Sequence, residues 1–329
     1  MSAQPRSRSV VCDGELAREL ARALGHEVTT LSRRASRYAT SATIEDVDVT
    51  LRDGSSLALT LKDLSRPALL AAARGVKAPF LRDPEREIDT YRLLLCDAAL
   101  GTPVCHSAVA DRARGRYWLA LERVPGVELY QVGELDRWEH AARWLAGMHE
   151  KLAPRIRDGS ALPALLVHDR DACRRWMRRA CAFAPDGAAI RRLAAVHEAA
   201  LDRLLALPVT VIHGDLFASN VLLCGPAGAE RVCALDWEMA GIGPGLLDLA
   251  SLVSGGWDEE ERTAIALAYH VASQHEATGD TDVFLADLDV CRLQLCIQLL
   301  GWSADWAPPG DHDHDWLGEA LELVERLGL

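Results

Sequence analysis

The sequence predicts an α+β protein in two parts, a first part built on an antiparallel sheet and a larger, mainly helical second part. Three observations support this prediction. Alternating apolar residues mark short strands within the first 124 residues. Pro125 and Gly126 then interrupt the strand pattern. Apolar residues recur at helical spacing over most of the following chain. We therefore expect one unit over residues 1–124, a hinge at about 122–126 and a second unit over residues 125–329.

The chain has 329 residues and a formal net charge of −12. This length allows two units, each with its own core. The acidic charge argues against a nucleic-acid partner, because a phosphate backbone favours a basic face. No apolar run approaches the roughly 18 residues that span a bilayer, so we expect no membrane partner. The nine cysteines lack paired spacing and no signal-peptide pattern is present, which predicts a reduced, cytoplasmic protein.

The first unit should begin with a helix and an antiparallel meander. Leucines four residues apart predict a helix that Asp13 caps and Gly25 ends. The following elements are expected to be strands over residues 27–31, 44–51 and 57–61, a helix over 84–94, and strands over 108–111 and 117–123.

The second unit should be mainly helical. Helical spacing is found over residues 135–152, within 153–207, and over 249–253, 259–275, 284–300 and 316–327. Apolar strands are expected at 209–212, 221–223 and 232–235.

The strongest chemical signal lies between two of these strands. His213, Gly214 and Asp215 follow the first strand, and Asn220 precedes the second. Phosphotransferases use an Asp and an Asn on such a loop, since the Asp accepts a hydroxyl proton and the Asn offers a neutral oxygen to Mg²⁺. The next strand ends at Asp236. A hairpin of the two later strands would bring Asp215, Asn220 and Asp236 around one point.

These motifs, together with Asp236-Trp237-Glu238 and Asp248-Leu249-Ala250, resemble the aminoglycoside phosphotransferase and choline kinase family. That family shares the protein-kinase fold, so the resemblance implies two lobes of protein-kinase-like architecture. It implies that Asp215 is the catalytic base and that Asn220 and Asp236 are metal ligands.

The resemblance also gives roles to neighbouring residues. It implies that Asp248 is a buried acid that braces the catalytic loop, and that Glu238 is a further acid close to the metal or the substrate. His213 is expected to pack and to hold Asp215 by hydrogen bonding. Phe217 stands where many relatives have His, which is a departure from the family pattern.

The nucleotide-binding residues are expected in the first unit. Lys62 ends the third strand, the position of the lysine that grips nucleotide phosphates in kinase-like folds. Glu87, on the next helix, matches the partner of that lysine, with Glu85 as the alternative. By resemblance, backbone groups from Glu122 to Val124 would bind the edge of the adenine ring.

Residues 32–41 should cover the phosphates, yet this segment contains no glycine. Backbone amides, Ser36 or the cluster of Arg33, Arg34 and Arg37 can contact phosphate, because an exposed N–H or guanidinium binds anions. The same cluster is equally consistent with an exposed basic loop that has no ligand.

The resemblance implies an O-phosphotransferase that uses Mg²⁺ and either ATP or GTP. The γ-phosphoryl group would pass to a hydroxyl of an aminoglycoside-like or other small hydroxylated acceptor, and the acidic charge suits a cationic one. Relatives insert the helices of the acceptor pocket at the position of residues 153–207.

Two alternatives compete with this function. A nucleotide-binding regulatory module or pseudokinase without turnover is suggested by the glycine-free segment, although Asp215, Asn220 and Asp236 count against it. A protein kinase proper is disfavoured because Asp248 follows Asp236 too closely to leave a platform for a peptide.

Two further features have simple structural interpretations. The alternating His and Asp residues of 311–316 resemble a metal site, but an acidic loop in which Asp315 caps the last helix is the preferred interpretation. Trp302 and Trp306 are expected to pack between helices, with contact to a substrate as the alternative.

Overall fold

The structure, a computed structural model, describes residues 9–36, 42–70, 77–157, 162–183, 187–226, 228–273, 280–302 and 314–329. The chain divides into two compact units, Met1–Pro125 and Gly126–Leu329. We call them unit 1 and unit 2.

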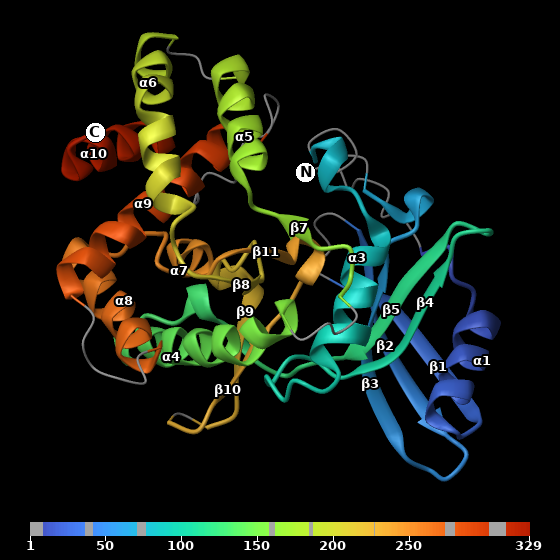
Figure 1. Ribbon diagram of the computed structural model, residues 1–329. Coiled ribbons are helices and arrows are strands. Elements are labelled where there is room, and N and C mark those ends of the chain that lie inside the picture. Colours follow the sequence, from blue (N-terminus) through green and yellow to red (C-terminus); the bar gives the residue numbers. More distant parts are fainter. Residues whose placement is uncertain are drawn as a thin grey trace, which may run out of the picture. The chain divides into compact units, whose positions relative to one another are not determined.

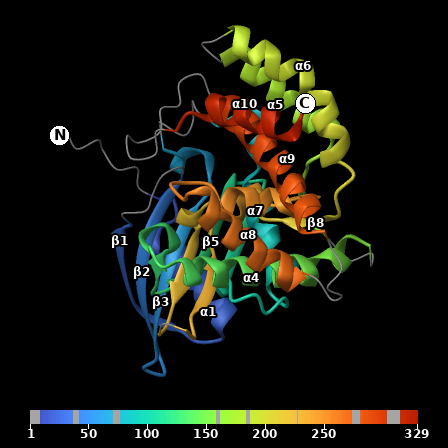
Figure 2. The same cartoon turned by 90° about the vertical axis from the view of Figure 1, so that its left-hand side faces the viewer.

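Unit 1 contains an antiparallel sheet with the strand order β1-β2-β3-β5-β4. Figure 1 shows this sheet, and β1, β2 and β3 follow one another across it in Figure 2. The predicted meander is confirmed, because β1 pairs with β2 and β2 pairs with β3, both antiparallel. The strands are β1 (Val28–Ala35), β2 (Thr43–Leu51), β3 (Ser56–Asp63), β4 (Cys105–Asp111) and β5 (Arg116–Glu122).

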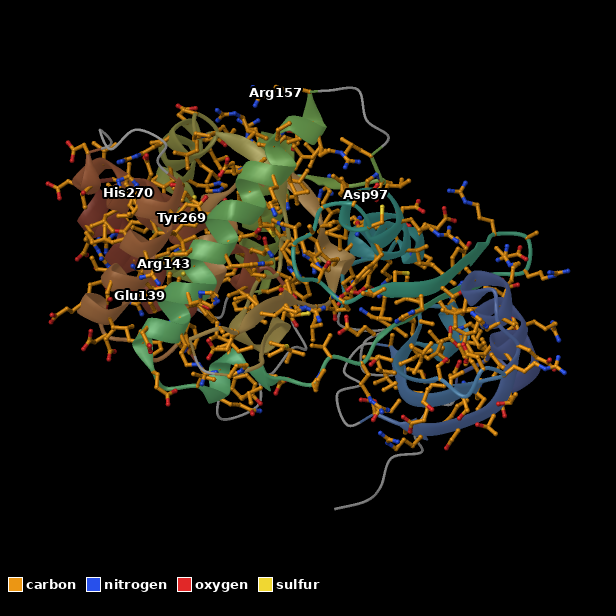
Figure 3. All side chains as sticks on the ribbon, turned by 90° about the horizontal axis from the view of Figure 1, so that it is seen from below. Asp97, Glu139, Arg143, Arg157, Tyr269 and His270 are labelled. Carbon is orange, nitrogen blue, oxygen red and sulfur yellow. The ribbon has the colours of Figure 1, made fainter. Side chains whose placement is uncertain are left out.

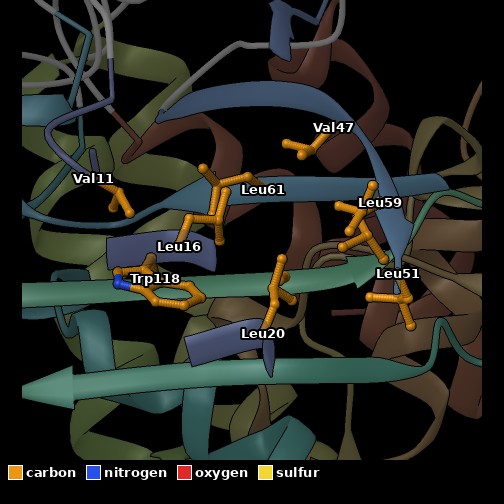
Figure 4. Close-up of a cluster of buried hydrophobic side chains, with 10 residues drawn as sticks. Val11, Leu16, Leu20, Val47, Leu51, Leu59, Leu61 and Trp118 are labelled. Carbon is orange, nitrogen blue, oxygen red and sulfur yellow. The ribbon is translucent and has the colours of Figure 1, made fainter. Parts of the chain in front are cut away.

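Helix α1 (Asp13–Leu24) covers one face of the sheet and completes a hydrophobic core. Leu16 and Leu20 project from the helix onto Trp118 of β5 and onto leucines of β3, as Figure 4 shows. Gly25 ends the helix in the left-handed region, with φ at 71°. The remaining members of this core are Val11, Val47, Val49, Leu51, Leu59, Leu61 and Ala120.

The prediction that Asp13 caps α1 is wrong. Cys12 occupies the cap position, and Asp13 is the first helical residue. The Asp13 carboxylate instead accepts a hydrogen bond of 2.9 Å from Arg33 Nη1. A long-range ion pair has therefore replaced the local cap.

Strand β1 extends four residues beyond the predicted end at residue 31 because its arginines find carboxylate partners on β2. Arg33 Nε donates to Glu45 at 2.7 Å, and Arg34 Nη1 donates to Asp48 at 2.8 Å. The alternative of an exposed basic loop is wrong for Arg33 and Arg34, since both are strand residues in ion pairs. Arg37 and the rest of 37–41 lie outside the described residues.

The predicted helix over 84–94 is present and changes character along its length. It begins as α3 (Pro84–Asp89), where the Asp83 carboxylate accepts a hydrogen bond from Glu85 N at 3.0 Å. It continues as a π-helical turn, η3 (Thr90–Leu95). Two short 3₁₀ turns, η1 (Arg66–Ala68) and η2 (Pro79–Leu81), precede it.

Unit 2 contains two small sheets. The first has the order β10-β9-β6 and includes the predicted hairpin, in which β9 and β10 pair antiparallel. The second has the order β7-β11-β8. The strands are β6 (Val127–Glu128), β7 (Leu166–Val167), β8 (Val209–Ile212), β9 (Val221–Cys224), β10 (Arg231–Ala234) and β11 (Gly241–Pro244).

The helices of unit 2 pack around α9, whose residues 288–297 are buried on every face. Helix α9 contacts α5, α6, α7 and α10, while α4 and α8 lie side by side, as Figures 1 and 2 show. None of the described helices is long and apolar enough to cross a membrane. The helices are α4 (Leu135–Leu152), α5 (Arg170–Phe183), α6 (Gly187–Leu204), α7 (Leu246–Leu252), α8 (Glu259–Ser273), α9 (Thr281–Leu300) and α10 (Trp316–Leu327).

Two structural interpretations are confirmed in this unit. The Asp315 side chain caps α10 and accepts a hydrogen bond of 2.8 Å from Gly318 N. Trp302 packs against Trp176 of α5, with ring centroids 5.8 Å apart and planes inclined by 8°. Trp306 and residues 311–313 lie outside the described part of the chain.

Candidate active site

Strand β8 ends at Ile212 and leads directly into the segment that carries Asp215 and Asn220. The short turn η6 (Ala218–Asn220) then delivers Asn220 to the start of β9. Asn220 Nδ2 donates to the Asp215 carbonyl at 2.8 Å and to Asp215 Oδ2 at 3.1 Å. Because the amide nitrogen is turned toward Asp215, the amide oxygen is left to accept from a donor or bind a cation.

Asp236 reaches the same place through the β9–β10 hairpin. Ala234 faces Val221 in the ladder, and Leu235 N donates to the Asn220 carbonyl at 2.8 Å. Asp236 follows at once with φ at 60°, one of two non-glycine residues with positive φ in the described chain. Such a conformation is strained and re-aims a side chain at the end of a strand. The structure therefore brings Asp215, Asn220 and Asp236 together within unit 2.

Gly214 is the residue that permits the sharp path of this loop. Its φ is 79°, and a Cβ atom placed there would lie 2.3 Å from the Met239 carbonyl oxygen. A distance under 3 Å to a backbone atom is a collision that requires the chain to move. Glycine is therefore dictated at this position by both backbone conformation and space.

Asp248 braces the loop from α7, as the resemblance implies. Its side chain is fully buried and accepts hydrogen bonds from His213 N at 2.7 Å and Gly214 N at 2.8 Å. His149 Nε2 is the third neighbour of this carboxylate, at 3.0 Å. Burial raises the pKa of Asp248, but the hydrogen bonds that it accepts from His149 and from His213 bring that pKa below its ordinary value.

His213 has the structural role expected of it. Its Nε2 donates to the Leu235 carbonyl at 2.7 Å, and its Nδ1 accepts from Asp215 N at 3.3 Å. One neutral tautomer satisfies both bonds. The ring also packs against Trp237, with centroids 4.7 Å apart. His213 thus ties Asp215 to the strand that carries Asp236.

The oxygen atoms of Asn220 and Asp236 suit a hard cation such as Mg²⁺. This ion is typically bound through one or two carboxylates together with phosphate oxygens and water. No group of three or more His, Cys, Asp or Glu side chains arranged for a metal occurs among the described residues. Glu238 lies in η7 (Trp237–Met239) and is half-buried.

Lys62 and Glu87 form the predicted ion pair in unit 1. The Lys62 Nζ atom lies 2.7 Å from Glu87 Oε2 and 2.9 Å from Oε1. Their side chains are only 6% and 1% exposed, which rules out the alternative of a solvated lysine. Glu85, the other candidate partner, pairs with Arg112 at 2.5 Å, and that hydrogen bond lowers the pKa of Glu85.

The other predicted nucleotide-binding groups also belong to unit 1. Ser36 N donates to the Ile44 carbonyl at 2.9 Å, and Ile44 faces Lys62 in the β2–β3 ladder. Ser36 therefore lies in line with Lys62 across the sheet, two strand spacings or about 10 Å away. The Ser36 residue is 9% exposed.

Some backbone N–H groups at the end of β5 and just after it already form hydrogen bonds within unit 1. Glu122 N donates to the Val104 carbonyl at 2.8 Å, and Arg123 N donates to the Ala58 carbonyl at 2.9 Å. The Glu122 carboxylate also accepts from Val104 N at 3.1 Å. Val124 N–H carries no hydrogen bond to any residue that the structure describes.

Two residues at the site were not predicted, His149 on α4 and Tyr269 on α8. His149 contacts Asp248, and Tyr269 contacts His149. The one signal for His149 in the sequence is its place beside Met148 on the apolar face of a predicted helix.

Comparison with protein families identifies the class of the chain. Residues 77–284, more than half of its length, match the model of the phosphotransferase enzyme family. The protein belongs to this family. No curated protein sequence matches the chain.

Solved structures share the fold at low sequence identity. A microcompartment-associated aminopropanol kinase is 19% identical, with a TM-score of 0.58 and coverage of 93% of both chains. A choline kinase from Cryptosporidium parvum Iowa II is 15% identical, with a TM-score of 0.56, over 90% of this chain and 88% of the other. The GDP complex of a mutant aminoglycoside 2′-phosphotransferase-IIIa is 12% identical, with a TM-score of 0.58, over 96% and 97%. The predicted protein-kinase-like fold is confirmed.

Proposed function

We propose that the protein is an O-phosphotransferase that transfers the γ-phosphoryl group of ATP or GTP to a hydroxyl of a small molecule. One observation supports this proposal above the others. Asn220 holds Asp215 by two hydrogen bonds, and the backbone bond from Leu235 to Asn220 sets Asp236 beside them. A base and two oxygen ligands in this arrangement are the groups that phosphoryl transfer requires.

Asp215 orients the acceptor hydroxyl and accepts its proton. Asn220 and Asp236 hold Mg²⁺, which neutralises charge on the nucleotide phosphates when it is bound. We assign Lys62, fixed by Glu87, a contact with nucleotide phosphate, and we assign further nucleotide contacts to Ser36 and to the backbone from Glu122 to Val124. Catalysis then consists of alignment and electrostatic stabilisation, because phosphoryl transfer asks little covalent work of the protein.

The proposed acceptor is an amine-bearing alcohol of aminoglycoside-like or smaller size. Structures of similar fold include an aminopropanol kinase, a choline kinase and an aminoglycoside phosphotransferase solved with GDP and kanamycin. The net charge of −12 favours a cationic molecule over an anionic one. We assign the acceptor pocket to the helices within residues 153–207, and we place the reaction in the cytoplasm.

The decisive experiment is a nucleotide-consumption screen of ATP and GTP against hydroxylated amines and antibiotics, with and without Mg²⁺. Asp215→Asn should lower kcat by a factor of about 10²–10⁴, the usual contribution of a general base. Asp282→Asn makes the same change at an exposed carboxylate of α9 and serves as the control. Unchanged turnover in Asp215→Asn, or no binding of any nucleotide with Mg²⁺, contradicts the proposal.

A nucleotide-binding module without turnover is the second candidate, because residues 32–41 contain no glycine. Nucleotide binding that depends on Mg²⁺, with no transfer to any acceptor, would favour it. A protein kinase proper gains no support from the structure. The chain between Asp236 and Asp248 is occupied by η7, β11 and the start of α7.

A further inference from the structure

A chain of buried hydrogen bonds runs from α8 to the catalytic loop. The Tyr269 hydroxyl lies 3.0 Å from His149 Nδ1, and His149 Nε2 lies 3.0 Å from Asp248 Oδ2. Asp248 in turn accepts from the backbone N–H groups of His213 and Gly214. Tyr269 therefore connects to the residues beside Asp215 through two side chains.

The direction of each hydrogen bond follows from what each group can do. Asp248 is ionised and can only accept, so His149 Nε2 must carry a proton. Burial raises the pKa of the Tyr269 phenol far above its ordinary value, which keeps its proton in place. Among the described residues, His149 is the one hydrogen-bond partner of the Tyr269 hydroxyl. The phenol thus donates to Nδ1, and the His149 ring is neutral with its proton on Nε2.

The surroundings of His149 are shaped to hold the ring in this place. A Cβ atom at Gly245 would lie 2.9 Å from His149 Nδ1, so the backbone passes as close as glycine allows. Thr210 Oγ1 donates to the His149 carbonyl at 2.9 Å and ties the end of α4 to β8. The Tyr269 and His149 rings meet edge to face, with centroids 5.8 Å apart. Figure 3 labels Tyr269 on α8, beside the green helix α4.

We propose that Tyr269 and His149 are positioning residues for the catalytic loop. The Tyr269 hydroxyl donates to Nδ1 and holds the His149 ring in the orientation in which Nε2–H donates to Asp248, and Asp248 then holds the backbone that presents Asp215. Without Tyr269, the buried Nδ1 atom loses its hydrogen-bond donor, so the ring can turn and weaken its hydrogen bond to the Asp248 carboxylate. The effect on turnover rests on the proposed function, while the effect on the ring and the loop does not.

The tautomer is measured by ¹⁵N NMR of the protein labelled at histidine, with His149→Gln used to assign the ring. We expect the Nε2–H tautomer in the wild type, and in Tyr269→Phe a shift of the Nδ1 resonance and broadening of the His149 signals as the ring moves. Exchange of the His213 and Gly214 amide protons with solvent should also become faster in that variant. Tyr117→Phe is the matched control, because its hydroxyl also interacts with a carboxylate, that of Glu85, but in unit 1.

Kinetic measurements distinguish a positioning role of Tyr269 from a role in stability alone. Tyr269→Phe should lower kcat roughly 10-fold with little change in the KM for nucleotide, since no substrate contact is lost. His149→Gln retains an N–H at the position of Nε2 and should keep more activity than His149→Ala. A loss of thermal stability with kcat unchanged overturns the proposal.

The outcomes distinguish this inference from the proposed function. An Nδ1–H ring in the wild type, or an unchanged His149 spectrum in Tyr269→Phe, overturns the inference whatever the activity. A protein that transfers no phosphoryl group contradicts the proposed function. In that case the tautomer and the amide exchange still decide whether Tyr269 holds the loop.

Discussion

Lys62 and Glu87 form an ion pair that is almost completely shielded from water, with Nζ 2.7 Å from Oε2. Moving both charges out of water costs about as much free energy as their attraction returns, so such a pair contributes little net stability. Retention of a charged group at this cost is more typical of a functional site than of a core. The pair therefore supports the proposed contact of Lys62 with phosphate.

Lys62→Met should leave Glu87 buried without its partner and reduce the free energy of unfolding by about 3–5 kcal/mol. The double variant Lys62→Met/Glu87→Gln should recover most of this loss, because no uncompensated charge remains. Urea unfolding of the single and double variants measures both values. Both variants should bind nucleotide more weakly. A double variant as unstable as Lys62→Met alone would show that the buried charge is not the cause.

Gly214→Ala should be far more damaging than Gly228→Ala, although both glycines have positive φ, at 79° and 82°. Nothing lies within 4 Å of a Cβ at Gly228, so that variant tests conformation alone, at about 1–2 kcal/mol. Gly214→Ala adds the collision with Met239, about 1–3 kcal/mol more. Thermal unfolding and turnover measured on both variants check this difference. Equal losses would mean that the loop can relax around the added methyl group.

Asp248 should make stability depend on pH in the acid range. The folded state lowers the pKa of Asp248 below the ordinary value of about 3.9. Its stabilising contribution is therefore complete above about pH 4 and is lost as the pH falls through the folded pKa. Asp248→Asn should be less stable near neutral pH but should lose less further stability on acidification. Urea unfolding from about pH 6 to about pH 3 compares the two slopes, and parallel slopes would contradict the shift.

Asn220→Ala should raise the Mg²⁺ concentration needed for half-maximal nucleotide binding by about 10-fold, equivalent to about 1.4 kcal/mol. One oxygen ligand is lost, whereas Asp236 is retained. A Mg²⁺ titration of nucleotide binding measures the shift directly. Ser219→Ala alters an exposed neighbour in the same turn and is the control. An unchanged titration would remove Asn220 from the metal site.

The clustering of Asp215, Asn220 and Asp236 could be predicted because its signal is local. Asp215 and Asn220 lie between two short apolar strands, and Asp236 follows the next one, so a hairpin alone brings them together. The position of Lys62 could be predicted for a similar reason, since the strand pattern places it near the end of β3.

Features that depend on distant partners could not be predicted in this way. His149 and Asp248 are 99 residues apart, and neither the histidine nor Tyr269 belongs to a local pattern. Strand β11 has the sequence Gly-Ile-Gly-Pro, a composition that is typical of a turn. It is a strand because β7 and β8 both pair with it. The length of β1 likewise depends on carboxylates that β2 supplies.

Asn220 is the only asparagine in the chain. Its amide nitrogen is also the group that grips Asp215, at 2.8 Å from the carbonyl and 3.1 Å from the carboxylate. Deamidation would replace this donor with a second negative charge beside Asp215. Deamidation of asparagine can therefore occur at one position alone. There the new carboxylate would repel Asp215 and destabilise the segment from Asp215 to residue 220.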